Sequence, residues 1–160
     1  MAYDSTVDAV AHIKKIQYIF NNVVIPEFEK RAKEHDQSKF ESPEKETYDK
    51  YIPMLQKTTY GSKEYHDVRK QMAAGGVEHH YQVNRHHPEH FENGIRGMNL
   101  FDLTEMFFDT FTASLRSDTG FEKGLEMNKD RFGMSDDLYQ ILVNTYNEVL
   151  KDRVDEFKAV

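Results

Sequence analysis

Apolar residues recur every three or four positions along nearly the whole of this 160-residue chain. This is the spacing of one face of an α-helix, and no stretch alternates apolar and polar residues for long enough to predict a half-buried strand. A chain of this length suits one compact domain with a substantial core. We therefore predict an all-α fold, a single-domain helical bundle of about six to seven helices that spans residues 1–160.

Capping residues and helix breakers predict the helix ends. Residues that suit N-caps precede four of the helical segments: Ser5, Ser62, Asn99 and Ser135. Pro26 should break or kink the first segment, so that residues 5–24 and 26–36 can pack as antiparallel helices. Ser42-Pro43 should open a helix, Gly75-Gly76 should kink one, and Gly133 should end one. The strongly apolar segment of residues 100–117 should be the most buried helix.

Composition excludes several classes of function. The chain has no cysteine, so a bound metal must be held by nitrogen and oxygen ligands. Its formal net charge of -7 argues against binding to duplex nucleic acid, which depends mainly on Lys and Arg. No apolar run is long enough to cross a membrane, and the N-terminus lacks a signal-peptide pattern. We expect a cytoplasmic protein.

Five of the eight histidines lie in residues 79–90, HHYQVNRHHPEH. Neutral imidazole is the commonest protein ligand for transition metals of intermediate softness. A surface histidine tract can also be solvated and bind nothing, so the metal interpretation depends on matching ligands elsewhere in the chain.

Matching ligands are present on both sides of this stretch. His35-Asp36 offers a nitrogen and a carboxylate side by side at an expected helix end, and His12 lies upstream on the first helix. Asp109 interrupts the apolar run MFFDTF, where a buried carboxylate is costly unless it is paired or binds a metal. These residues, together with the histidine stretch, predict a metal site.

The order His12, His35-Asp36, paired histidines and Asp109 resembles the HD-domain metal-dependent phosphohydrolase superfamily. Lys39 matches a lysine three positions after the Asp in many members, and His79-His80 looks like the paired histidine of its two-metal branch. The phrases HDQSKFESPE, HHYQVNRHHPEHFENG, MNLFDLTEMF and NKDRFGMS are similar to those of a small, poorly characterised family from bacteria and their viruses.

The resemblance implies an all-helical fold and one or two divalent ions, with Mn, Fe, Co, Ni and Zn as candidates. Four residues would form the primary site: His12, His35, Asp36 and Asp109. His80 and one of His86 or His87 would serve a second ion, with His79 and His90 in reserve. Asp36 would orient the attacking water.

Lys39 and Arg85 are the cations that we expect to contact phosphate oxygens, with Asn84, Tyr81 and His90 as further candidates for substrate binding. Lys39 can instead be a solvated helix-end lysine. Arg85 can instead pair with Glu89 one turn away. Tyrosines are candidates for the lining of a nucleobase pocket: Tyr48, Tyr51, Tyr60 and Tyr81. Asp102 and Glu105 share a helix face with Asp109. They either add carboxylates to the site or form the solvated end of that face, and we expect the second.

We therefore expect a metal-dependent phosphohydrolase for a small phosphorylated metabolite, most readily a nucleotide. Two alternatives stay open: a di-iron oxygenase on the same fold, and a non-catalytic nucleotide- or protein-binding factor of viral origin. If a bacteriophage encodes the chain, it would act in the cytoplasm of the bacterial host. A homodimer is compatible with the sequence.

Overall fold

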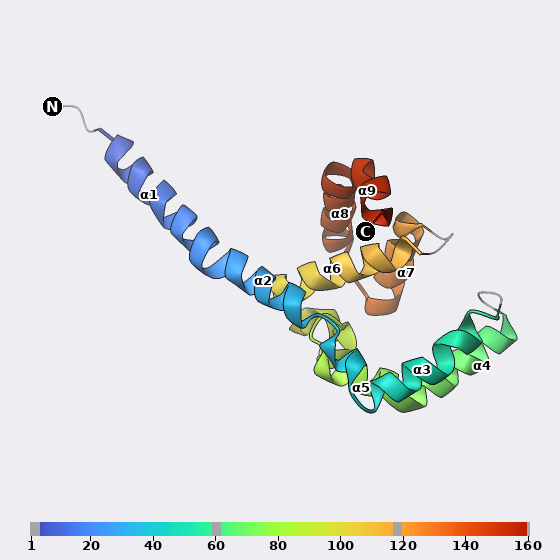
Figure 1. The fold of residues 1–160 in the computed structure, drawn as a ribbon. Coiled ribbons are helices and arrows are strands. Elements are labelled where there is room, and N and C mark those ends of the chain that lie inside the picture. The colour runs from blue at the N-terminus through green and yellow to red at the C-terminus, as the bar shows by residue number, and fades with distance from the viewer. Residues whose placement is uncertain (1–3, 59–61, 117–119, 160) are drawn as a thin grey trace. The chain divides into compact units, whose positions relative to one another are not determined.

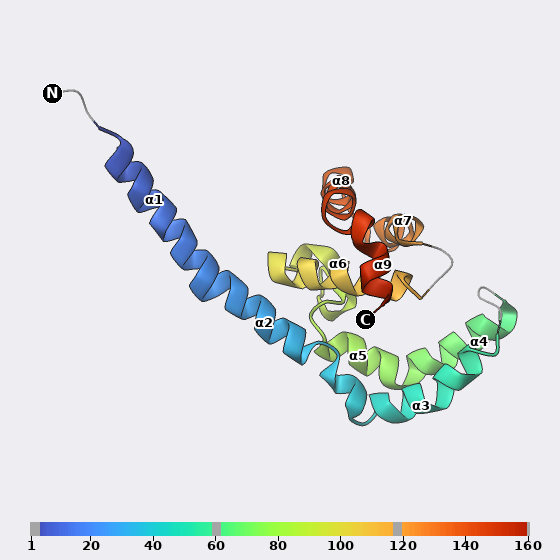
Figure 2. The same ribbon diagram turned by 45° about the horizontal axis from the view of Figure 1, so that its top comes forward.

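The computed structural model describes residues 4–58, 62–116 and 120–159, so Tyr60 and Ser117 lie outside the described residues. The described chain is built from helices and contains no strand, which confirms the all-α prediction (Figures 1 and 2). The chain forms two compact units, Met1–Asp36 and Gln37–Val160. That residues 1–160 form one domain stays a prediction. No helix in the described ranges combines the length and apolar character needed to cross a membrane.

The first unit is a run of helix without an interruption. Helix α1 (Thr6–Ile19) continues through a π-helical turn (Phe20–Val24) into α2 (Ile25–Glu34) (Figure 1). The expected break at Pro26 is therefore wrong, and so is the antiparallel packing that it would allow. Pro26 occupies the first turn of α2, where the missing N–H does least damage. Ser5 precedes α1 but makes no side-chain capping bond.

The second unit begins with a short 3₁₀ turn (Gln37–Phe40) and a pair of packed helices, α3 (Glu44–Leu55) and α4 (Lys63–Met72). The predicted N-cap is confirmed because Ser62 Oγ accepts from the backbone N–H of Tyr65 at 3.1 Å. A small core holds the two helices and the next turn together: Val68, Met72 and Val77, with Tyr48, Tyr51, Leu55 and Tyr81 packed against it.

The predicted glycine kink is confirmed between α4 and the short helix α5 (Glu78–Val83). The intervening turn, Ala73–Val77, is π-helical, and Gly75 leaves the helical region with φ −111° and ψ −120°. A Cβ at Gly76 would lie 2.6 Å from the Cα of Glu44, and the Gly76 N–H donates to Thr47 Oγ1 at 2.8 Å. Only a glycine lets this turn approach α3 so closely, which places α5 beside Glu44.

The remaining helices surround a larger core. They are α6 (Leu100–Ser114), α7 (Phe121–Phe132), α8 (Asp136–Thr145) and the short α9 (Val154–Lys158). Their buried residues form one cluster: Met106, Phe107, Phe111, Phe121, Leu125, Met134, Leu142 and Leu150. The N-caps at Asn99 and Ser135 are confirmed, as is Gly133, which ends α7 with φ 62°. Helix α6 contributes buried residues to this core, as predicted.

Candidate metal centre

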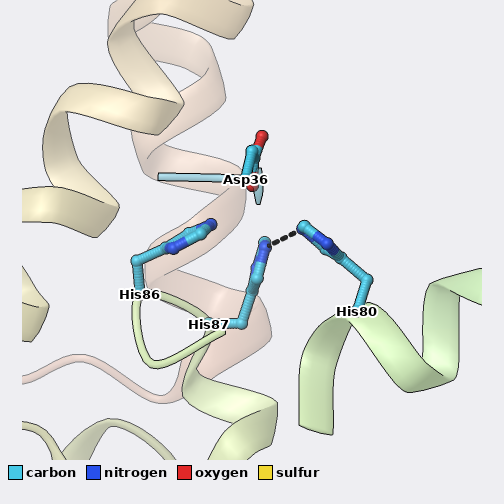
Figure 3. Close-up of side chains that lie close together, drawn as sticks. All are labelled: Asp36, His80, His86 and His87. Carbon is cyan, nitrogen blue, oxygen red and sulfur yellow. Dashed lines mark hydrogen bonds between the residues drawn. The ribbon is translucent and has the colours of Figure 1, made fainter. Parts of the chain in front are cut away.

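Three imidazoles meet where α5 ends and the next loop folds back. The ring centres of His80 and His87 are 4.7 Å apart, and those of His86 and His87 are 4.2 Å apart. Figure 3 shows the two Nε2 atoms of His80 and His87 facing each other at 2.9 Å. This separation is that of a hydrogen bond between the two rings. Two nitrogens bound to one tetrahedral ion at about 2.1 Å would lie about 3.4 Å apart, so a small movement of either ring would make them a pair of ligands.

A buried carboxylate fixes the orientation of His80. The side chain of Glu44 is 0 % exposed, and its Oε2 lies 2.8 Å from Nδ1 of His80. Ser38 Oγ donates to the same oxygen at 3.0 Å, and Oε1 lies 2.8 Å from Nδ1 of His79. Because a carboxylate only accepts, Nδ1 of His80 carries the proton, and its Nε2 carries a lone pair in the neutral ring. That lone pair faces His87.

A second carboxylate orients His86 in the same way. Its side chain is buried, and Nδ1 lies 3.1 Å from Oε1 of Glu105 on α6. A histidine that binds a metal through one ring nitrogen usually donates through the other to a carboxylate or a carbonyl. His80 and His86 both have this arrangement, with carboxylates from different helices.

Asp36 adds an oxygen ligand to the three imidazoles (Figure 3). One ligand atom from each of Asp36, His80, His86 and His87 can be chosen so that all lie within 4.8 Å of one another. Asp36 is the one non-glycine residue with positive φ, 57°, in the described chain. This cluster of histidines and an aspartate can hold a metal ion.

Arg85 and Asp102 form a bidentate pair beside the histidines. Arg85 Nε donates to Asp102 Oδ1 at 3.0 Å, and Nη2 donates to Oδ2 at 2.9 Å. The guanidinium also lies 4.9 Å from the ring centre of Phe91. Asp102 is 0 % exposed and Glu105 is partly buried, so the expectation that these two acids are solvated is wrong. Their partners, Arg85 and His86, lie 17 and 19 positions away in sequence. Helical spacing predicts contacts only between residues three or four positions apart, so it could not predict these pairs.

The alternative pairing of Arg85 with Glu89 is not found among the described contacts. Glu89 instead accepts from Arg131 on α7, which also donates to the Tyr81 hydroxyl at 3.4 Å. The ring of Tyr81 lies 4.8 Å from that of His87. Arg131 thus ties α7 to the histidine stretch, and no local pattern predicted this contact.

The other predicted substrate residues lie on or near the same stretch. Asn84 donates to Ser38 Oγ at 2.8 Å and to the backbone oxygen of His80 at 2.9 Å, which closes the end of α5. Lys39 lies 5.5 Å from the ring centre of Tyr48. His90 stacks edge-on against Phe91. Their contacts with a substrate stay predictions.

The remaining predicted ligands are spread over both units. His79 is partly exposed and contacts Glu44. His12 is exposed on α1, and Nε2 of His35 lies 3.5 Å from Oδ2 of Asp36. Asp109 is partly buried on α6. Metal binding by these four residues stays a prediction.

Glu44 was not predicted as a site residue, and Glu105 was considered one only as the less favoured alternative to a solvated carboxylate. Glu44 lies among many glutamates, and its histidine partners are 35 and 36 positions away. The one signal in the sequence was indirect: Gly75-Gly76 directly precedes the histidine stretch, and a glycine pair inside a helical segment can mark a close backbone approach.

Comparison with known proteins places the chain in a family. The model of a family of unknown function, DUF5662, matches residues 1–154. The chain belongs to this family. No curated protein and no solved structure matches it. Membership of DUF5662 assigns no activity, so a function must be inferred from the site itself.

Proposed function

We propose that the protein is a metal-dependent phosphohydrolase that acts on a small phosphorylated metabolite, in the first place a nucleotide. One observation carries the proposal: His80 and His86 each have a carboxylate at Nδ1, Glu44 and Glu105, within a cluster that includes His87 and Asp36. The order of histidines and aspartates that resembles the HD-domain superfamily supports the same interpretation.

The ligand set defines the class of metal. His80, His86, His87 and Asp36 offer nitrogen and oxygen donors, which suit Mn, Fe, Co, Ni or Zn as one or two divalent ions. An ion held there supplies Lewis acidity and lowers the pKa of a bound water toward about 7. Glu44 and Glu105 keep the imidazoles in the required tautomer and orientation.

Cations next to the cluster suit an anionic substrate. The Arg85 side chain is 48 % exposed, and Asp102 takes up one hydrogen of Nε and one of Nη2. A guanidinium has five N–H donors, so about three are left to bind phosphate oxygens. Asp102 also holds the Arg85 guanidinium in one orientation, so less conformational entropy is lost when a phosphate binds. Lys39 supplies a second positive charge on the turn that follows Asp36.

Metal analysis combined with a screen for phosphate release tests the proposal. We expect the purified protein to contain a transition metal, and to release phosphate from one or more nucleotides when supplied with manganese, cobalt, nickel or magnesium. His80→Ala and Asp36→Ala should each abolish release. His66→Ala is the matched control, because His66 is exposed on α4 and should leave activity unchanged.

Three results would overturn the proposal. Equal activity in His80→Ala and the control would place the reaction elsewhere. A protein that binds a nucleotide but never releases phosphate, with binding intact in Asp36→Ala, would be a binding factor. An iron-loaded protein with a visible absorption band and oxygen uptake would be an oxygenase.

A further inference from the structure

The helix of the first unit carries a long row of exposed apolar side chains. No residue of α1, the π-helical turn or α2 is buried, and neither hydrophobic cluster includes one. Nine large hydrophobic side chains between residues 7 and 25 are exposed by 43 % to 72 %: Val7, Val10, Ile13, Ile16, Tyr18, Ile19, Phe20, Val23 and Ile25. Most of the stability of a protein helix comes from packing an apolar face, so this helix needs a partner.

The spacing of these residues is that of a helix that pairs with another helix. Ala9, Ile13, Ile16, Phe20 and Val23 follow one another at intervals of four, three, four and three residues. A repeat of 3.5 residues keeps one seam facing a second helix.

The charged residues of the same stretch avoid this seam, whereas Thr6 takes one of its core positions and His12 lies at its edge. If Ile13 and Ile16 take the two core positions of a heptad, the charged and amide side chains fall on its three outermost positions, with Gln17 as the exception at the edge of the seam. These outer polar residues are Asp8, Lys14, Lys15, Asn21 and Asn22. The flanking positions next to the seam include Val10 and Ile19, which widen the apolar face. Pairing two such helices would therefore bury no charge.

We propose that this face, the α1 seam, pairs with the α1 seam of a second copy of the chain. A twofold interface uses the same surface on both partners, and an apolar row with charges only on the outside complements itself. The six exposed side chains in or next to the seam are Val10, Ile13, Ile16, Ile19, Phe20 and Val23. They leave roughly 500 Å² of apolar surface per chain, so a pair would bury up to about 1,000 Å², which is the lower limit for a specific interface.

The surface of the second unit offers no comparable row among its described residues. Its large exposed apolar residues are spread over several elements, with no more than two on any one of them, such as Ile52 and Met54 on α3, Val83 on α5 and Ile141 on α8. Scattered apolar residues are normal on any protein surface. The seam runs without a break from Ala9 to Val23, and a second copy of the chain presents a row of the same length and spacing.

Cysteine labelling of the full chain tests the pairing, because the sequence has no cysteine of its own. Ile16→Cys places a thiol in the seam, and Lys15→Cys places one on the outer face of the same turn. We expect a maleimide to label Ile16→Cys about tenfold more slowly than Lys15→Cys, and we expect this protection to disappear on dilution as the dimer dissociates. Light scattering of the unmodified chain should give twice the single-chain mass of 18.8 kDa.

Other outcomes would overturn the proposal. Protection of Ile16→Cys that persists in a monomer at every concentration would mean that the seam packs within its own chain. Equal labelling of both variants would mean that nothing covers it. Ile13→Asp should convert the dimer to a monomer whereas Lys14→Asp should not, and a dimer that survives Ile13→Asp would place the interface elsewhere. None of these measurements depends on the metal centre.

Discussion

Oε2 of Glu44 lies 2.8 Å from Nδ1 of His80, and the Glu44 side chain is wholly buried. A carboxylate without solvent contact is stabilised only through its hydrogen bonds, here to two histidines and Ser38. This arrangement is costly for a purely structural role and useful for a ligand histidine, whose orientation and basicity it sets.

Glu44→Gln should weaken metal binding by about 10–100-fold, because the neutral amide orients and polarises His80 less well. Isothermal titration with Mn²⁺ or Zn²⁺ measures the effect. Glu46→Gln, two residues away on the exposed side of α3, is the control and should bind metal as the unmodified chain does. Identical affinities for the two variants would remove Glu44 from the site.

Gly76→Ala should both destabilise the fold and weaken the metal site. The new Cβ would lie 2.6 Å from the Cα of Glu44 and 2.9 Å from the Pro43 oxygen, so backbone must move. We expect a loss of about 1–3 kcal/mol in the free energy of unfolding. Gly124→Ala, where a Cβ meets no atom within 4 Å on α7, should instead gain about 0.5–1 kcal/mol. Denaturant titration distinguishes the two, and a neutral Gly76→Ala would contradict the close approach.

Helix ends were predictable from sequence because their chemistry is local. Ser62, Asn99, Ser135 and Gly133 act on backbone groups within a few residues, and each was predicted correctly. At Pro26 the expected break was wrong, because the helix continues through a π-helical turn just before the proline, although Pro26 does lie in the first turn of the following helix, as its chemistry favours.

The candidate site was only half predictable. The histidine-rich stretch and Asp36 stand out by composition and spacing. Glu44, Glu105 and Asp102 acquire their importance from partners many positions away, which only the folded chain brings together. The shared helix face with Asp109 set Asp102 and Glu105 apart from other acidic residues but did not identify their partners, and nothing in the sequence set Glu44 apart.

Asp102→Ala should cost about 2–4 kcal/mol of stability, because it removes a capping bond at the start of α6 together with the Arg85 pair. Arg85→Ala should cost less, since Asp102 keeps the Asn99 N–H. The double variant should show a coupling energy of about 0.5–3 kcal/mol. Asp130→Ala, an exposed change on α7, should be close to neutral. Strictly additive losses would mean that the pair contributes nothing beyond its separate parts.

Metal binding to the cluster of Asp36, His80, His86 and His87 should raise the thermal stability of the protein. At a free concentration about 100 times its dissociation constant, an ion that binds only the folded state adds about 2.7 kcal/mol, or about 5–10 °C in Tm for a chain of this size. Chelation should reverse the shift. The metal-induced rise in Tm should be absent in His87→Ala and present in His66→Ala. A shift of equal size in both variants would assign the ion to another site.

The two carboxylates behind the imidazoles belong to different parts of the second unit. Glu44 lies on α3, whose tyrosines pack on the small core around Met72, whereas Glu105 lies on α6 within the larger core around Phe107. An ion held by both His80 and His86 would join these two separately packed cores. In a chain that cannot form a disulfide, it would be the cross-link that makes the two halves unfold as one cooperative unit, and limited proteolysis between them would report its loss.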